Sequence, residues 1–133
     1  MSFIRHALLA LAALVLVTLP TTDPAEARSG WTIRKEVERG KSIDLQTMYF
    51  INTRTCKAHK VPPQPAFRNV PKLGQVKFRS GTTQPRQCPS ETINANFTIY
   101  TAGATSGRDR FTIRYKATES SKTFNVRFIV DVK

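Results

Sequence analysis

The chain has 133 residues, of which 21 are Lys or Arg and 9 are Asp or Glu, so its formal net charge is +12. A chain of this length can build one hydrophobic core, and it excludes two independent domains of ordinary size. The charge favours anionic partners and does not bear on the fold class.

The first 27 residues read as an export signal. Arg5 precedes an apolar run over residues 7–19, and residues 25–27 are the small-x-small pattern that signal peptidases cut. As a helix the run would span about 20 Å, too short for a hydrocarbon core of about 30 Å. We therefore expect a signal peptide over 1–27, one mature domain over 28–133, no membrane span, and a periplasmic or secreted location.

The segment after the signal favours β-structure, because Val, Ile, Thr and aromatic residues are frequent in it. Apolar positions predict a strand over 31–37. A second strand follows Gly40, and its apolar parity changes between Leu45 and Met48, which predicts a β-bulge. Between residues 52 and 74 four prolines predict irregular or edge structure, because proline cannot donate to a ladder. These prolines are Pro62, Pro63, Pro65 and Pro71.

The second half of the chain gives stronger signals. Residues 76–79 predict a short strand, and residues 80–90 predict a loop that contains two prolines and a cysteine. Alternation predicts three further strands with one buried face each, over 93–99, 111–117 and 124–132, although Ile129 breaks the polar set of the last one. In the first of them the expected buried residues are Ile93, Ala95, Phe97 and Ile99. The expected fold class is therefore all-β, with about seven strands in one domain.

Alternation also predicts the register of the terminal hairpin. Inward residues are odd-numbered before the turn and even-numbered after it. A four-residue turn over 119–122 places Arg114 opposite Arg127, Lys116 opposite Asn125 and Arg110 opposite Asp131. An anion between Arg114 and Arg127 would offset the repulsion between these two like charges.

Cys56 and Cys88 are the two cysteines, and in an exported chain they predict one disulfide. Closing a loop of about 33 residues would stabilise the fold by about 3 to 4 kcal/mol. Metal binding is the competing use of these thiols. After cleavage His59 is the one remaining histidine, so the three side chains are one short of a closed zinc site. We expect no metal and no cofactor.

Two short motifs occur in about the last 60 residues of the chain. Residues 107–113 read G-x-D-x-F-x-x before a final alternating strand, and residues 71–76 read P-x-x-G-x-V. Tyr100 stands in a strand between them. Together these features resemble the C-terminal signature of bacterial cadherin-like and immunoglobulin-like domains.

This resemblance implies an immunoglobulin-like Greek-key β-sandwich of about seven strands. In such a domain Gly107 would supply unusual backbone geometry, Asp109 would cap nearby amides, and Phe111 would begin the buried face. These roles are structural. Domains of this kind serve mostly in adhesion, spacing or binding, so the resemblance implies no catalytic residue.

The excess of positive charge is the main functional signal. Removing residues 1–27 takes away one Arg and two acidic residues, which leaves 20 Lys and Arg against 7 Asp and Glu. A small domain needs a net charge of only about 2 to 8 for solubility. We expect a basic sheet face that binds an anionic polymer or an acidic protein outside the cytoplasm. Its candidate residues are Arg110, Arg114, Lys116 and Arg127 on the terminal hairpin, joined by Lys77 and Arg79 on a neighbouring strand.

Other interpretations remain open. The same cations could serve only to solubilise a small sandwich and to protect its edges from aggregation. A structural or inhibitory domain could bind protein through its proline-rich loops over 57–71 and 80–90. A small hydrolase could use Glu36, Glu38 or His59. Nucleic acid is disfavoured, because most aromatic residues fall on the inward parity. The sequence does not indicate an oligomeric state.

Overall fold

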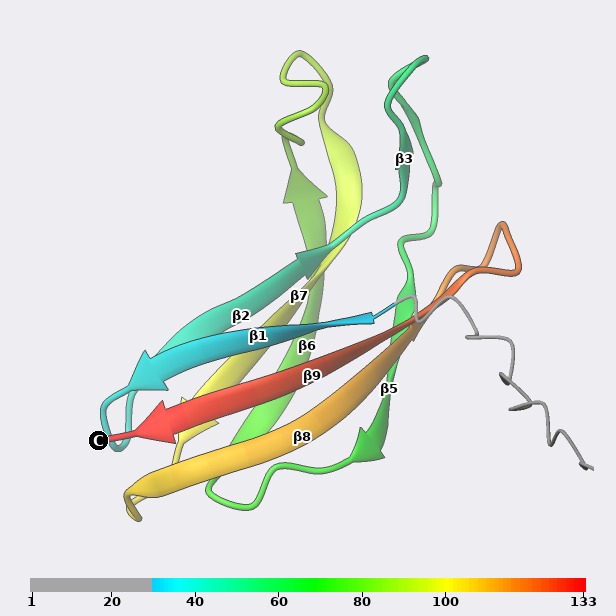
Figure 1. The fold of residues 1–133 in the computed structure, drawn as a ribbon. Coiled ribbons are helices and arrows are strands. Elements are labelled where there is room, and N and C mark those ends of the chain that lie inside the picture. The colour runs from blue at the N-terminus through cyan, green and yellow to red at the C-terminus, as the bar shows by residue number, and fades with distance from the viewer. Residues whose placement is uncertain (1–29) are drawn as a thin grey trace, which may run out of the picture.

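The computed structural model describes residues 30–133, which contain nine β-strands and no helix (Figure 1). The all-β class expected from the sequence is therefore confirmed. The expected signal peptide, residues 1–27, lies outside the described residues. Within residues 30–133 no helix is long and apolar enough to cross a membrane.

The strands form two larger sheets and one small hairpin. The four-stranded sheet has the order β1-β9-β8-β5, and the three-stranded sheet has the order β2-β7-β6. All neighbouring pairs are antiparallel except β1 and β9, which run parallel. The bounds are β1 Gly30–Val37, β2 Ser42–Met48, β3 Ile51–Asn52, β4 Lys57–Ala58, β5 Gln64–Asn69, β6 Gly74–Thr83, β7 Ile93–Ala102, β8 Gly107–Lys116 and β9 Thr123–Val132.

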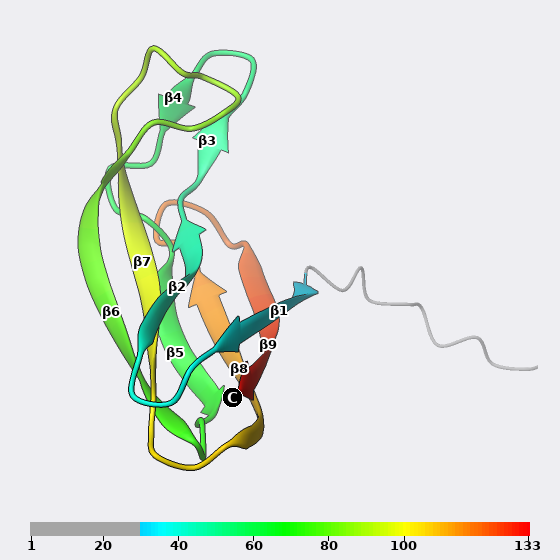
Figure 2. The same cartoon turned by 90° about the vertical axis from the view of Figure 1, so that its left-hand side faces the viewer.

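One hydrophobic core lies between the two larger sheets (Figure 2). The ring of Tyr100 on β7 stacks on Phe111 of β8 with 5.8 Å between centroids, and Phe111 stacks on Phe128 of β9 at 5.2 Å. A buried hydrogen bond of 2.6 Å joins the hydroxyls of Thr98 and Tyr115 across the same interface. Alternate residues of β8 and β9 supply this core as the sequence predicted, because every second side chain of a strand points to the same face. For β7 the predicted face is wrong: Thr98, Tyr100 and Ala102 enter the core, while Phe97 lies on the outer side against Arg79.

The two irregular features expected in the first half are present. The register between β2 and β7 shifts between Asp44 and Gln46, so Leu45 is the extra residue of a bulge. The bulge lets both Leu45 and Met48 be buried despite their different parity. The proline-rich segment contributes β5, which is an edge strand and carries Pro65.

The predicted register of the terminal hairpin is wrong by two residues. In the structure Arg114 lies opposite Asn125, and Arg127 lies opposite Thr112. The four-residue loop spans 118–121, closed by a hydrogen bond from the Ala117 amide to the Lys122 carbonyl. Both registers keep the same residues inside, so alternation could not distinguish them.

Contacts outside the hairpin favour the observed register. The hydroxyl of Thr118 donates to the carbonyl of Val61 at 3.3 Å, and the amide of Val61 donates to the carboxylate of Glu119 at 3.2 Å. These two contacts require Thr118 and Glu119 to lie in the hairpin loop, as they do when the loop spans 118–121. At the other end of the hairpin the register places Arg108 opposite Asp131, where they form an ion pair.

Strand β6 is longer than the sequence predicted. The sequence predicts a loop over residues 80–90, but residues 80–83 continue the strand. They pair with residues 93–96 of β7. Gly81 is tolerated in this strand because the ring of Phe97 covers it: a Cβ at this position would lie 2.9 Å from that ring.

The G-x-D-x-F motif connects the two sheets. Gly107 has a φ of 145°, which other residues rarely adopt, and Phe111 begins the buried alternation of β8. Asp109 is only 2% exposed, and its two oxygens accept hydrogen bonds from the Lys72 amide at 2.9 Å and the Leu73 amide at 2.8 Å. Each of the three residues therefore has the geometry that the resemblance implied. Asp109 holds the connection between β5 and β6.

Two buried tyrosines should make the fold sensitive to alkaline pH. Burial raises the pKa of Tyr115 to about 12, and burial together with the hydrogen bond to Asp109 raises the pKa of Tyr100 further. Because both folded-state pKa values exceed the unfolded value near 10, the stability that these two tyrosines contribute is constant below pH 10 and falls as the pH rises from 10 toward 12. Phenolate absorbance of these two residues should appear together with loss of circular dichroism, and phenolate formation by both tyrosines in the folded protein would contradict this expectation.

The expected disulfide joins Cys56 and Cys88, with 5.7 Å between their Cα atoms. It ties the β3–β4 hairpin to the loop between β6 and β7, and the hydroxyl of Tyr49 adds a hydrogen bond to Gln87 of the same loop. Because both thiols are consumed, the competing metal-binding use of these cysteines does not apply.

Candidate functional site

The outer face of the four-stranded sheet carries most of the predicted basic residues. Arg110, Arg114 and Lys116 on β8 and Arg127 on β9 are all exposed there. Since Arg127 lies opposite Thr112, it stands diagonally between Arg110 and Arg114 rather than directly facing one of them. Diagonal neighbours in a sheet are about 7 to 8 Å apart, within reach of long side chains. Three guanidinium groups can therefore approach one anion.

The structure adds Arg34, which the sequence did not indicate. Strand β1 runs parallel to β9 and places Arg34 opposite Ile129, while Arg110 lies opposite Ile129 on the other side. Ile129 points outward with the arginines, yet it is only 7% exposed. The aliphatic parts of the two neighbouring arginines are placed to cover it, because such side chains lie along apolar surface with the charged group in water. We define Arg34, Arg110, Arg114, Lys116 and Arg127 as the arginine face.

The carboxylates of this sheet lie at one end only. Asp131 pairs with Arg108 at 2.7 Å, and Glu36 pairs with Lys133 at 2.9 Å. The hydrogen bond from Arg108 holds the pKa of Asp131 below its usual value. Among residues 30–133 no carboxylate forms an ion pair with any member of the arginine face. Arg34 is near enough to Asp131 to help lower the pKa of that carboxyl group, while the charges of the other four members are available to an anion from solution.

Lys77 and Arg79 do not belong to this face. They lie on β6, at the edge of the three-stranded sheet, so the expected continuous face of six cations is wrong for these two. The guanidinium of Arg79 lies 4.6 Å from the centroid of the Phe97 ring on β7, in a cation–π contact. The sequence could not show that β6 pairs only with β7.

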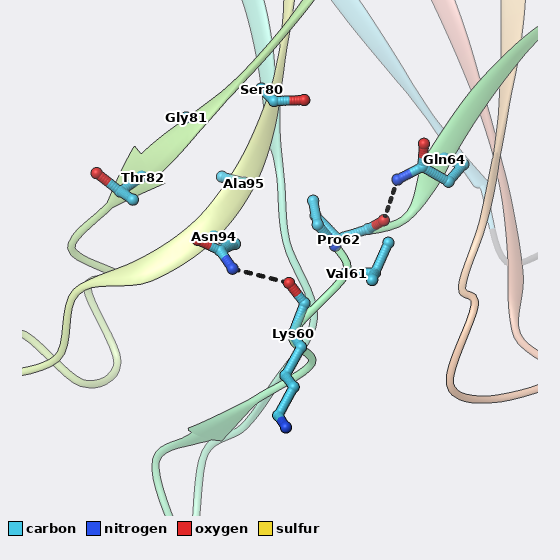
Figure 3. Close-up of a pocket in the computed structure, with 9 residues that line it drawn as sticks. All are labelled: Lys60, Val61, Pro62, Gln64, Ser80, Gly81, Thr82, Asn94 and Ala95. Carbon is cyan, nitrogen blue, oxygen red and sulfur yellow. Dashed lines mark hydrogen bonds between the residues drawn. The ribbon is translucent and has the colours of Figure 1, made fainter.

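A shallow pocket of about 410 Å³ lies between β6, β7 and the segment that leads into β5 (Figure 3). The amide of Asn94 donates to the carbonyl of Lys60 at 2.8 Å and so holds one wall, while the side chain of Lys60 extends away from β6. The amide of Gln64 donates to the carbonyl of Pro62 at 2.8 Å. Polar groups of Ser80 and Thr82 come from β6.

The residues considered for hydrolysis do not converge. Glu36 is paired with Lys133 near the C-terminal end of β1, whereas His59 follows β4, which lies at the end of the molecule away from the C-terminus (Figure 2). The ring of His59 stacks on Phe50 at 4.4 Å, and its Nδ1 atom is buried without a hydrogen-bond partner. Within the described part of the chain, no group of three His, Cys, Asp or Glu side chains is arranged to hold a metal ion.

Comparisons with known proteins add little to this description. No protein-family model matches the chain, and no curated protein matches it. A solved structure titled "Solution Structure of Amebosin" shares 9% identity with the chain, covering 78% of this chain and 96% of its own, with a TM-score of 0.42. The function proposed below therefore rests on this chain's own residues.

Proposed function

We propose that the protein is an exported, non-enzymatic binding module that recognises an anionic envelope or extracellular partner through the arginine face. The observation that carries this proposal is the group of four arginines and one lysine on one sheet face without a paired carboxylate. Like charges so close together are unfavourable unless an anion lies among them.

An immunoglobulin-like Greek-key topology is part of the proposal. The order β2-β7-β6 corresponds to the B-E-D sheet of such domains, and β9-β8-β5 corresponds to G-F-C. In this assignment β1 extends the second sheet by pairing with β9, the last strand of the chain. The geometry of Gly107, Asp109 and Phe111 also supports this assignment, because these residues carry the resemblance in the sequence.

The chemistry of the face favours sulfate, phosphate or carboxylate groups carried on a polymer or a protein. Guanidinium groups bind such anions through two parallel hydrogen bonds, which a lysine cannot provide. The outward residues of the four-stranded sheet include no aromatic side chain on which a nucleic-acid base could stack. We therefore favour an acidic polysaccharide or acidic protein over nucleic acid.

The disulfide supports an oxidising compartment, as the export signal over residues 1–27 would require. We propose a periplasmic or secreted location on these two grounds.

Charge reversal at Arg110 and Arg127 tests the proposal. The double variant Arg110→Glu/Arg127→Glu should bind dextran sulfate at least about 30-fold more weakly, because each exposed cation near an anionic surface contributes about 1 kcal/mol and reversal adds repulsion. Binding can be measured by titration calorimetry over a range of salt concentrations. Binding of the wild-type protein should fall steeply with salt.

The matched control is Arg54→Glu/Lys57→Glu, which changes the net charge equally at the tip of the β3–β4 hairpin. It should retain most of the affinity. Equal losses in both double variants would show that net charge alone attracts the polymer and would overturn the proposal. Unchanged binding at about 1 M salt, where the screening length is about 3 Å, would overturn it as well.

A further inference from the structure

Most of the large apolar side chains that are exposed lie on or beside the two edge strands β5 and β6. Of the five large hydrophobic residues that are exposed in the described chain, four lie on β5, β6 or the segments flanking β5. These are Val61 at 45%, Phe67 at 40%, Val70 at 60% and Phe78 at 36%. Phe67 and Phe78 are in ring contact, and contiguous apolar surface that is exposed on a small domain indicates an interaction site.

The two phenylalanines mark the place where the core reaches solvent. Phe67 lies opposite the buried Ile113, and Phe78 lies opposite the buried Thr98, so both rings point between the sheets. Their centroids are 5.4 Å apart. They remain exposed because β5 and β6 are the edge strands of their sheets, and no described strand lies beyond β6 (Figure 2).

The free edge of β6 is suited to pair with another strand. It has ten residues and no proline, and it pairs with β7 along its whole length. Within residues 30–133 no backbone hydrogen bond joins the other edge of β6 to another segment. Strand β5 is a poorer template, because it contains Pro65 and its register shifts at Arg68. A long unpaired edge of this kind is an open template for pairing.

Charge identifies the partner that suits this edge. Between Asp44 and Glu91 the sequence has no Asp or Glu and eight Lys or Arg. Arg68 follows Phe67, while Lys77 and Arg79 flank Phe78, and all three are exposed. A second copy of this chain would bring like charges together. An acidic segment would be attracted.

The pocket continues this surface along β6. Ser80 and Thr82 point to the same side of the strand as Phe78, because they follow it at intervals of two residues. Both residues line the pocket (Figure 3). A strand added to β6 would therefore place one side chain on the aromatic pair and a later one, about 13 Å further on, in a polar pocket.

We infer that β6 binds an extended acidic segment of a partner protein as an added antiparallel or parallel strand. Main-chain hydrogen bonds supply the affinity, and the side chains that face the molecule supply the specificity. An apolar side chain packs on Phe67 and Phe78, and acidic side chains lie near Lys77 and Arg79. This site is separate from the arginine face and does not depend on the function proposed for it.

The test uses a synthetic ten-residue peptide, the length of β6, in which Asp alternates with Val and one Phe replaces a central Val. Added to the full exported form of the protein, it should slow amide hydrogen exchange of alternate β6 residues and shift their NMR resonances. A second peptide has the same sequence but carries N-methyl groups on alternate backbone amides. It should bind at least about tenfold more weakly, because it retains every side chain but cannot complete the ladder.

Two protein variants separate this site from the arginine face. Lys77→Glu/Arg79→Glu should weaken peptide binding at least about tenfold, whereas Arg110→Glu/Arg127→Glu should leave it unchanged. Equal binding of both peptides would overturn the inference, as would exchange protection confined to β1, β8 and β9. Displacement of the peptide from β6 by dextran sulfate in equimolar amounts would show that this edge takes polysaccharide instead, and would also overturn it.

Discussion

Replacing Asp109 with Ala should lower the free energy of unfolding by about 3 to 5 kcal/mol. Its carboxyl group accepts hydrogen bonds from the amides of Lys72 and Leu73 and from the hydroxyl of Tyr100, at 2.8 to 2.9 Å. Without it these donors lose their acceptor in a region that water barely reaches. Urea denaturation followed by circular dichroism measures the effect.

The matched control is Asp131→Ala, which removes another aspartate from the same hairpin. Asp131 is paired with Arg108 at the surface, so this change should have a much smaller effect. Tyr100→Phe removes one of the three hydrogen bonds to Asp109 and should cost about 1 kcal/mol. If Asp109→Ala were no more destabilising than Asp131→Ala, the connection between β5 and β6 would not depend on this carboxylate.

Replacing both cysteines with Ala should cost about 3 to 4 kcal/mol, because the disulfide closes a long loop in the unfolded chain. The bridge spans 32 positions of the sequence and joins two segments that have few regular hydrogen bonds of their own. Urea denaturation of the wild type and the double variant measures the loss.

The same change should act locally as well. Amide hydrogen exchange should accelerate most over residues 51–58 and 84–92, since the β3–β4 hairpin has only two residues in each strand. Strands β8 and β9 should stay protected. A uniform acceleration over all strands, or a loss below about 1 kcal/mol, would contradict this account of the disulfide.

The sequence predicted the strongest strands well because alternation is a local property. In β8 and β9 every second residue is apolar, and these residues are the ones that the two sheets bury. In β7 the alternation predicted the strand but the wrong face, because Thr98, Tyr100 and Ala102 enter the core while Phe97 and Ile99 are only half-buried. The bulge at Leu45 could also be predicted, because an extra residue must change the parity. The end of β6 was missed because Ser80, Gly81 and Thr82 carry no apolar alternation; pairing with β7 makes them a strand.

The candidate site was predicted only in part, because alternation along one strand does not show which strands lie beside it. Alternation placed Arg110, Arg114 and Arg127 on one outer face, and the structure agrees. It could not show that β1 adds Arg34 through parallel pairing, nor that β6 carries Lys77 to the other sheet. Both depend on which strands become neighbours.

The sequence by itself determined the all-β class, the disulfide and the buried face of β8 and β9, because these follow from residue types and a period of two along the chain. Only the tertiary structure decided the order of strands, the register of the last hairpin and the exposure of Phe67 and Phe78. Strand order and register join residues that are far apart in the chain, and several arrangements bury the same side chains. Contacts such as those of Asp109 with the β5–β6 connection favour one of them.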